Sequence, residues 1–363
     1  MRVARPRAHA ATIERLWGAT REGRLAHALL FEGPEGVGKF LAAQWLAAGL
    51  LCERGPDAPC GACGPCKRVA SGDVRSNHPD VFVLDPTDPL LAGDFERGNA
   101  WRVHRVAYRP DTPGIDDPGH CIERALELRA LEGERRAVLV RECHRMNVAA
   151  QNALLKTLEE PRAGTLLVLE THEPAVLLPT IRSRCIRIRF RSLEHADCEA
   201  VLVACGLEPA VAAELARTAR GAPGVALAEE RMGVRALREL HAAVAEGSRE
   251  PLEAAEELWQ LPGEFAGSTA AAQERERARV AGDVALALAN DGLRAAVGAL
   301  PGSLTSGASA ARLARLGETE LRRRVDALAL ARSDLEHNLA PASVLERILL
   351  VLARGSAAVP ARV

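Results

Sequence analysis

Short runs of consecutive apolar residues recur through the first half of the chain, and each has the length of a β-strand. Stretches of helical period lie between them, including 121–131 and 149–158. Uninterrupted apolar strands that alternate with helices are typical of a parallel sheet covered on both faces. The runs are Ala28–Phe31, Val81–Leu84, Ala137–Val140 and Leu166–Leu169. The first half is therefore predicted to be an α/β domain.

The pattern changes after residue 192, where only helical periods continue. The predicted helices lie at 193–206, 209–220, 224–231, 252–261, 270–297 and 318–339. A last helix carries a broad apolar stripe of Val344, Leu345, Ile348, Leu349 and Leu352, of the kind that faces a helical core. We predict an α/β domain over 1–191, a small helical domain over 192–233 and a helical C-terminal domain over 234–363. The stretch 86–118, rich in Pro, Gly, Asp and Arg, is expected to be an irregular insertion.

A glycine-rich loop, Gly33–Lys39, follows the first apolar run and precedes a helical pattern. The backbone N–H groups of such a loop and the N-terminus of the next helix cradle phosphates, while the lysine reaches the terminal ones. The predicted nucleotide-binding residues are Gly33, Gly36, Gly38 and Lys39 in the loop, with Glu142 and Thr171 at the ends of later strands.

Two positions that normally help to hold Mg²⁺ carry residues that cannot do so. The loop motif ordinarily ends in Ser or Thr, whose hydroxyl binds the ion, but Phe40 stands there. The third strand ordinarily ends in an Asp that organises the metal and a Glu that polarises water. Here Arg141 precedes Glu142, and its guanidinium would repel the ion. We therefore predict weak binding of ATP or ADP without Mg²⁺-dependent hydrolysis.

Four cysteines, Cys52, Cys60, Cys63 and Cys66, follow the spacing C-x7-C-x2-C-x2-C. Zn²⁺ takes four thiolates in a tetrahedron, and the intervening Pro and Gly residues supply the turns that this requires. Because all four positions are Cys, no place remains for water, so we predict a structural zinc module over about 52–66. The isolated cysteines are predicted to be small buried apolar side chains: Cys121, Cys143, Cys185, Cys198 and Cys205.

Composition narrows the function further. The chain has 47 basic and 48 acidic residues, a net charge of −1 and only 3% aromatic residues. Such a balance disfavours a protein that binds nucleic acid by overall positive charge or by stacked aromatic side chains. No secretion signal is evident and no apolar run approaches the ~20 residues of a membrane-spanning helix. We therefore expect a cytoplasmic protein with no membrane partner.

The order of these motifs resembles that in the clamp-loader subunits of bacterial DNA polymerase III, which are AAA+ proteins. The resemblance includes the helix Gln-Asn-Ala-Leu-Leu-Lys-Thr-Leu-Glu-Glu-Pro at 151–161 and the tripeptide Ser183-Arg184-Cys185. It is dense over about 25–227 and returns weakly at 335–352. It implies an AAA+ domain with an inserted zinc module, a helical lid domain and an all-α collar domain.

The resemblance also implies partners and a role. Family members form hetero-oligomers of motor subunits and a clamp-opening subunit, which act on the sliding clamp and primer-template DNA. Within the family the chain resembles the delta-prime type, because Phe40, Arg141 and Gly224 depart from the ATP-hydrolysing motor subunits. Gly224 stands where motors carry a lid arginine that senses the γ-phosphate. Arg184 matches the arginine that reaches into a neighbour's ATP site as a trans-acting finger.

Two other functions stay open at this point. The chain is an ATP-hydrolysing motor subunit (gamma/tau-like) of the same loader if Lys39 and Glu142 suffice and phosphates and water hold Mg²⁺. It is a stand-alone zinc-dependent nucleic-acid-binding protein if the cysteine module binds DNA or RNA by itself, although its charge balance and scarce aromatic residues weigh against this.

Overall fold

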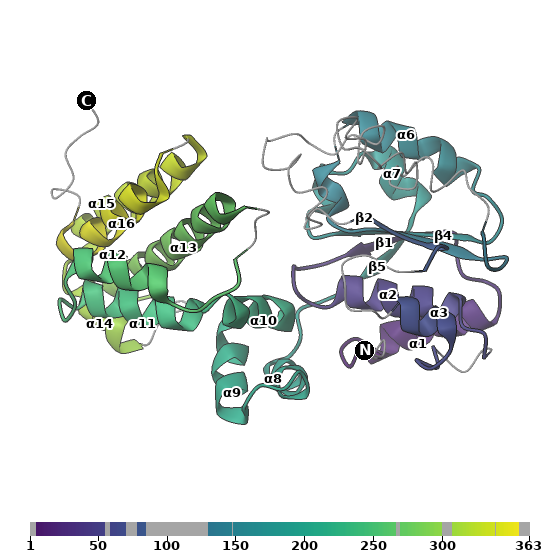
Figure 1. The fold of residues 1–363 in the computed structure, drawn as a ribbon, viewed down its shortest axis with the longest axis horizontal. Helices are drawn as coiled ribbons and strands as arrows, with labels where there is room; N and C mark the ends of the chain where they lie inside the picture. Colours follow the sequence, from purple (N-terminus) through teal and green to yellow (C-terminus); the bar gives the residue numbers. More distant parts are fainter. Residues whose placement is uncertain are drawn as a thin grey trace. The chain divides into compact units, whose positions relative to one another are not determined.

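A computed structural model describes residues 5–54, 59–69, 78–84, 130–146, 148–265, 269–299, 307–337 and 339–355. The chain forms two compact units, Met1–Ala212 with Gly221–Gly224, and Ala213–Arg220 with Val225–Val363. The first contains a sheet with helices and the second is helical (Figure 1). The insertion predicted at 86–118 and most of the helix predicted at 121–131 lie outside the described residues. The division into three domains stays a prediction.

Within the described part of the first unit, five parallel strands form one sheet in the order β2-β3-β4-β1-β5. They are β1 (Ala28–Glu32), β2 (Val81–Leu84), β3 (Arg136–Val140), β4 (Thr165–Thr171) and β5 (Ile186–Arg189). Strands β1, β3 and β4 are buried along their whole length, which explains the uninterrupted apolar run that each contains. The four predicted strands are confirmed, and β5 is an additional strand at the end of the sheet.

The strand pairing brings several chain segments to one edge of the sheet. Leu30 in β1 pairs with Leu169 in β4, and Val140 in β3 pairs with the same residue from the other side. Because all strands are parallel, the loops that follow β1, β3 and β4 lie together at the carboxyl edge, where the strands end. The segments that precede the strands lie at the opposite, amino edge.

Helices cover both faces of this sheet, as the alternating pattern predicts (Figure 1). Those on one face are α1 (Ala10–Arg21), α2 (Lys39–Leu50) and α3 (Gly64–Val69), and those on the other are α6 (Val148–Glu159) and α7 (Pro179–Arg184). On the second face Leu154 and Ile181 pack with Leu167 in one buried cluster. On the first, the rings of Trp17 and Trp45 meet edge to face at 5.2 Å and join α1 to α2.

After β5 the described residues form helices joined by turns and loops. They are α8 (His195–Ala204), α9 (Pro209–Thr218), α10 (Pro223–Arg231), α11 (Val234–Ala245), α12 (Pro251–Gln260), α13 (Ala270–Ala296), α14 (Gly307–Ala314), α15 (Glu318–Ser333) and α16 (Pro341–Arg354). In the second unit α13 contacts α11, α14, α15 and α16. The predicted apolar stripe of α16 is buried in this core. No helix among the described residues combines the length and apolar character that a membrane span requires.

A parallel sheet with helices on both faces, followed by a helical region, fits the AAA+ architecture that the resemblance implies. The helices predicted after residue 192 are all present within a few residues of their expected bounds. The last turn of the helix predicted over 318–339 instead forms a short 3₁₀ segment at Asp334–His337.

Candidate functional site

The glycine-rich loop connects β1 to α2 at the carboxyl edge of the sheet. Its glycines have positive φ values, 146° at Gly33, 71° at Gly36 and 96° at Gly38. A Cβ atom at Gly33 would lie 2.0 Å from the carbonyl oxygen of Phe190, so no side chain fits there. The loop is therefore a tight turn that runs directly into a helix, the geometry that presents N–H groups to an anion.

Lys39 is held inside its own loop. Its Nζ donates to the carbonyl oxygens of Gly33 at 2.9 Å and Pro34 at 2.6 Å, and lies 3.1 Å from Oε1 of Glu170. The side chains of Lys39 and Glu170 are only 2% and 10% exposed. A phosphate that bound to Lys39 would therefore have to replace contacts that the lysine already makes.

Glu170 is a residue of this site that sequence reasoning missed. Its Oε2 also accepts a hydrogen bond at 3.2 Å from the backbone N–H of Glu142, so it joins the loop to the end of β3. The available signal was a carboxylate placed directly after the apolar run Leu166–Leu169, as Glu142 follows the run that ends at Val140.

Glu142 and Thr171, both predicted to bind nucleotide, lie at this edge and have partners within the chain. Glu142 has a left-handed φ of 49°, and its carboxylate lies 2.7 Å from Nε of Arg145. Thr171 is fully buried; its Oγ1 accepts a hydrogen bond from the backbone N–H of Glu173 at 2.9 Å and lies 3.1 Å from Nδ1 of His144.

Phe40 and Arg141, which are predicted to stand at positions that normally hold Mg²⁺, contact each other. The guanidinium carbon of Arg141 lies 5.4 Å from the centre of the Phe40 ring, within the range of a cation–π interaction. Both side chains are half-buried. A cationic group thus stands beside the first residues of α2, where a divalent ion would need oxygen ligands.

Gly224, which the resemblance places where motor subunits carry a lid arginine, packs directly on the glycine-rich loop. Its backbone N–H donates to the carbonyl oxygen of Gly36 at 2.7 Å, and a Cβ atom here would lie 2.8 Å from that same oxygen. Because the two backbones are so close, a side chain at position 224 could not be accommodated without a shift of the loop.

Arg184, the predicted finger, ends α7 just before β5. Its Nη2 lies 2.5 Å from Oε1 of Glu159 at the end of α6, and its Nη1 donates to the carbonyl oxygen of Thr180 at 3.1 Å. The side chain is 36% exposed, so solvent still reaches it. Arg184 precedes its strand and therefore lies at the amino edge of the sheet, whereas the glycine-rich loop follows β1 at the carboxyl edge.

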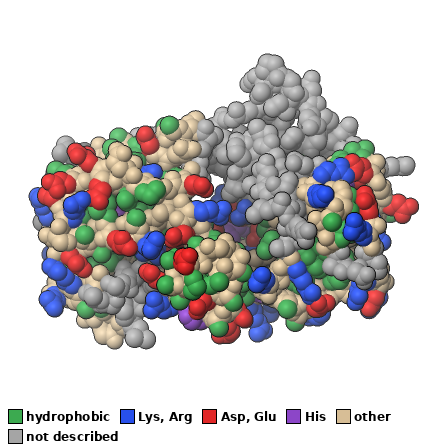
Figure 2. All heavy atoms as spheres, turned by 60° about the horizontal axis from the view of Figure 1, so that its bottom comes forward, with side chains coloured by type: hydrophobic (Ala, Val, Ile, Leu, Met, Phe, Trp, Pro, Cys, Tyr) green, Lys and Arg blue, Asp and Glu red, His purple; other side chains and the backbone are tan. Residues whose placement is uncertain are grey.

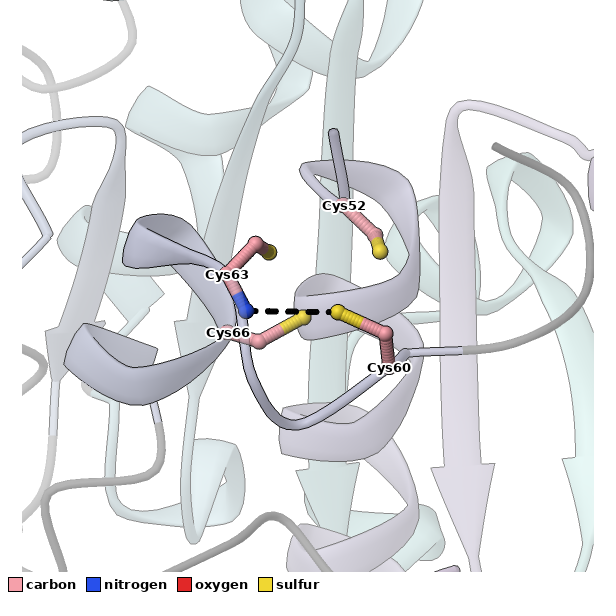
Figure 3. A group of neighbouring side chains, drawn as sticks. All are labelled: Cys52, Cys60, Cys63 and Cys66. Atoms are coloured by element: carbon pink, nitrogen blue, oxygen red, sulfur yellow. Dashed lines mark hydrogen bonds between the residues drawn. The ribbon is translucent and has the colours of Figure 1, made fainter. Parts of the chain in front are cut away.

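The four predicted zinc ligands come together between α2 and α3 (Figure 3). One sulfur from each of Cys52, Cys60, Cys63 and Cys66 lies within 4.8 Å of the others. The backbone N–H groups of Ala62 and Cys63 donate to Sγ of Cys60 at 3.4 and 3.3 Å. These bonds lower the pKa of Cys60 to about 6, which favours the thiolate that binds metal. The cluster therefore fits Zn²⁺.

The isolated cysteines mostly follow the sequence prediction. Cys143, Cys185 and Cys198 are buried, and burial raises the pKa of each thiol. The prediction is wrong for Cys205, which is exposed because it follows the last turn of α8, where the neighbouring residues also face solvent. Cys121 lies outside the described residues.

Comparison with known proteins identifies relatives of the chain. Residues 8–194 match the family described as DNA polymerase III, delta subunit. The delta' subunit of DNA polymerase III from Pseudomonas aeruginosa is 38% identical over 231 residues, which are 62% of this chain and 62% of that protein. The delta' subunit from Bacillus subtilis is 32% identical over 201 residues, 55% of this chain and 53% of that protein.

Gamma/tau subunits of DNA polymerase III are also similar to the chain. The gamma/tau subunit from Mycobacterium tuberculosis is 35% identical over 181 residues, which are 50% of this chain and 27% of that protein. The matched part of the chain spans less than two thirds of the length of each of these relatives. The family match covers more than half of the chain and includes the glycine-rich loop, the cysteine cluster and Arg184. The chain therefore belongs to the DNA polymerase III delta-subunit family.

Proposed function

We propose that this chain is an assembly subunit of a clamp loader that does not hydrolyse ATP and donates Arg184 to the ATP site of a neighbouring motor subunit. Its partners are then motor subunits and a clamp-opening subunit, and through the complex the sliding clamp and primer-template DNA. The observation that carries this proposal is the placement of Arg184 and the glycine-rich loop at opposite edges of one sheet.

The strand register allows the distance between Arg184 and the glycine-rich loop to be estimated. Pairing between β1 and β5 runs from Leu29 opposite Ile186 to Glu32 opposite Arg189. At about 3.3 Å per residue, this paired stretch alone separates Arg184 from Gly33 by more than about 10 Å along the strands. Arg184 therefore acts on a phosphate that another chain holds. Arginine suits this role because its planar, permanently charged group stabilises charge that develops during phosphoryl transfer.

The chain's own loop supports the other half of the proposal. Phe40 and Arg141 occupy the positions of magnesium ligands, Lys39 is bound to Glu170, and Gly224 leaves no room for a lid arginine. Without the ion, the charge of the transferring phosphoryl group would not be neutralised. ATP or ADP binds weakly to the loop amides and Lys39, without turnover.

The zinc module is structural in this proposal. Four thiolates from Cys52, Cys60, Cys63 and Cys66 complete the tetrahedron and leave no open position for a substrate. A stand-alone nucleic-acid binder is less well supported. On the face that Figure 2 displays, basic and acidic side chains of the described residues are interspersed and form no continuous basic surface.

The motor function is the one alternative with specific support, because Lys39 and Glu142 are present at one edge and gamma/tau proteins are similar to the chain. Turnover by the isolated chain separates the two functions. We expect no ATPase activity above background. Hydrolysis near 1 s⁻¹, at the low end of ordinary enzyme rates, that disappears in Lys39→Ala would favour the motor function.

The finger role is tested in a reconstituted assembly in which only the motor subunit beside this chain keeps an intact loop lysine. Arg184→Ala should assemble normally but lower DNA-stimulated ATP turnover by about 10³-fold or more. Arg184→Lys should rescue poorly, because a point charge does not reproduce the planar fork. Arg162→Ala, which removes another exposed arginine at the amino edge, is the matched control. If assemblies with Arg184→Ala hydrolyse ATP and load clamps as the wild type does, the finger role is wrong and only a scaffolding role remains for the chain.

A further inference from the structure

Two histidines and a carboxylate meet at the carboxyl edge, outside the residues considered so far as ligands. His144 lies in the 3₁₀ segment Cys143–Arg145 after β3, while His172 and Glu173 follow β4. The two imidazole rings pack edge to face with 4.3 Å between their centres, and Nε2 of His172 lies 3.4 Å from Oε1 of Glu173. One nitrogen or oxygen atom from each of the three residues lies within 4.8 Å of the others.

The sheet explains why these side chains converge. Strands β3 and β4 are parallel neighbours, with Val140 paired to Leu169, so the segments that follow them leave the sheet side by side. His144 comes four residues after the first member of that pair, and His172 three residues after the second. The cluster is thus built on two strand ends, which are rigid supports, and not on a single loop.

A contact with a buried threonine also orients the ring of His144. Nδ1 of His144 lies 3.1 Å from Oγ1 of Thr171, a residue with no exposed surface. Histidines that bind metals usually donate the hydrogen of their other ring nitrogen to an oxygen acceptor, which fixes the ring and its tautomer. With Nδ1 bound to Thr171, Nε2 is the nitrogen left for a ligand.

We propose that His144, His172 and Glu173 bind one divalent transition-metal ion, such as Zn²⁺, Co²⁺ or Ni²⁺. Imidazole nitrogens suit these ions, whereas Mg²⁺ prefers oxygen ligands, so the site is not a magnesium site. Two neutral imidazoles and one carboxylate form the donor set of known three-ligand zinc sites, which keep a position open for water or another oxygen ligand.

Solvent access and charge permit binding. The side chains of His172 and Glu173 are 27% and 56% exposed, so an ion can enter from solvent. The nearby cations Arg145 and Lys39 are paired with Glu142 and Glu170, which offsets their repulsion of a divalent ion. The site differs from the cysteine cluster in its nitrogen and oxygen donors, and this difference makes the two distinguishable in solution.

The test uses the full chain without a histidine tag, first loaded with one equivalent of Zn²⁺ at the cysteine cluster and then titrated with Co²⁺. We expect a second equivalent of metal to bind, with a spectrum that lacks thiolate-to-cobalt charge-transfer absorption. Absence of a second equivalent would overturn the proposal, because no site besides the cysteine cluster would then bind metal. A second equivalent with thiolate absorption would overturn it too, because cobalt would then be bound by cysteines.

Variants assign the ligands. His172→Gln and, separately, His144→Gln should weaken Co²⁺ binding at the second site by at least ~100-fold, since loss of a ligand should exceed the roughly 10–100-fold cost of losing a ligand's hydrogen-bond partner. Thr171→Val, which removes that partner, should cost roughly 10–100-fold. His195→Gln removes an exposed histidine elsewhere and should change nothing. Retention of the zinc equivalent shows that each variant is folded, and unchanged Co²⁺ affinity in folded His172→Gln would refute the site.

Discussion

The guanidinium of Arg141 lies over the Phe40 ring, 5.4 Å from its centre, although 100 residues of sequence separate them. From the sequence, each residue is predicted independently to remove a position that normally holds Mg²⁺. In the structure they are partners, because the end of β3 lies beside the start of α2. A change at one residue therefore alters the surroundings of the other.

This contact predicts that the two positions do not respond independently. In a double-mutant cycle of Phe40→Thr and Arg141→Asp, we expect a coupling of about 0.5–1 kcal/mol in the free energy of unfolding, the size of a partly exposed cation–π pair. Only the double variant should bind ATP more tightly when Mg²⁺ is added, since each single variant keeps one obstructing residue. Mg²⁺-dependent binding in Phe40→Thr alone would contradict this prediction.

The buried pair of Lys39 and Glu170 predicts a second effect. Glu170→Gln removes the charge that lies 3.1 Å from the ammonium group, so it should destabilise the first unit by up to about 3–5 kcal/mol. Inorganic phosphate or ATP should restore part of that stability, because an anion can take the place of the carboxylate. Chemical denaturation with and without phosphate measures both effects.

The matched control for this experiment is Glu160→Gln, which removes an exposed carboxylate just after α6. It should change stability by no more than about 0.5 kcal/mol and show no added response to phosphate. Equal behaviour of the two variants would mean that the pair does not hold Lys39 in place.

Removal of zinc should affect one part of the first unit. We expect a chelator to increase hydrogen exchange in α3 and at the end of α2, while the amides of β1 and β4 stay protected by their ladders. Elemental analysis should give about one zinc per chain in protein purified without chelators. Cys60→Ser should lose it, and Cys205→Ser, at an exposed cysteine outside the cluster, should keep it. Zinc-free protein with unchanged exchange would contradict the structural role.

The strands that could be predicted are those whose own apolar residues indicate that they are buried. β1, β3 and β4 are covered on both faces, and each therefore contains an uninterrupted run of four or more apolar residues. β5 reads Ile-Arg-Ile-Arg, lies at the end of the sheet and is largely exposed. Its arginines are accommodated because Arg187 and Arg189 both bind the buried carboxylate of Glu32 across the sheet. These contacts with Glu32 cannot be inferred from the residues around β5 alone.

The same distinction holds for the candidate site. The cysteine cluster could be predicted because its ligands are close in sequence and their spacing reflects the geometry of one ion. The contacts of Lys39 with Glu170 and of His144 with His172 could not, because they depend on which strands are neighbours. Strand order is decided by packing of the whole sheet, so it cannot be inferred from the spacing of residues along the chain.

A buried histidine in the second unit predicts an acid response. His241 in α11 has no exposed surface, and burial lowers its pKa from 6.5 to about 4. Below pH 6.5 the unfolded chain takes up a proton at this ring while the folded chain stays neutral. The contribution of neutral His241 to the free energy of unfolding is therefore at its full value above pH 6.5. It falls as the pH decreases towards 4, by as much as about 3 kcal/mol.

Measurement of the unfolding free energy between pH 7 and pH 4 checks this. His241→Gln should flatten the dependence, whereas His337→Gln, at an exposed histidine of the same unit, should leave it as in the wild type. An identical slope in His241→Gln and the wild type would show that other groups cause the acid response.

The separation of Arg184 from the glycine-rich loop gives the chain a polarity. Subunits that each offer an arginine edge to the loop edge of the next associate head to tail, through heterologous contacts that use two different surfaces. Under the proposed function, this chain has an active donor edge and an inert acceptor edge. The neighbour on its loop side then need not supply an arginine. Such a subunit can stand at one end of an open array of subunits. No neighbour is needed on its loop side there, because its own loop does not form an active ATP site.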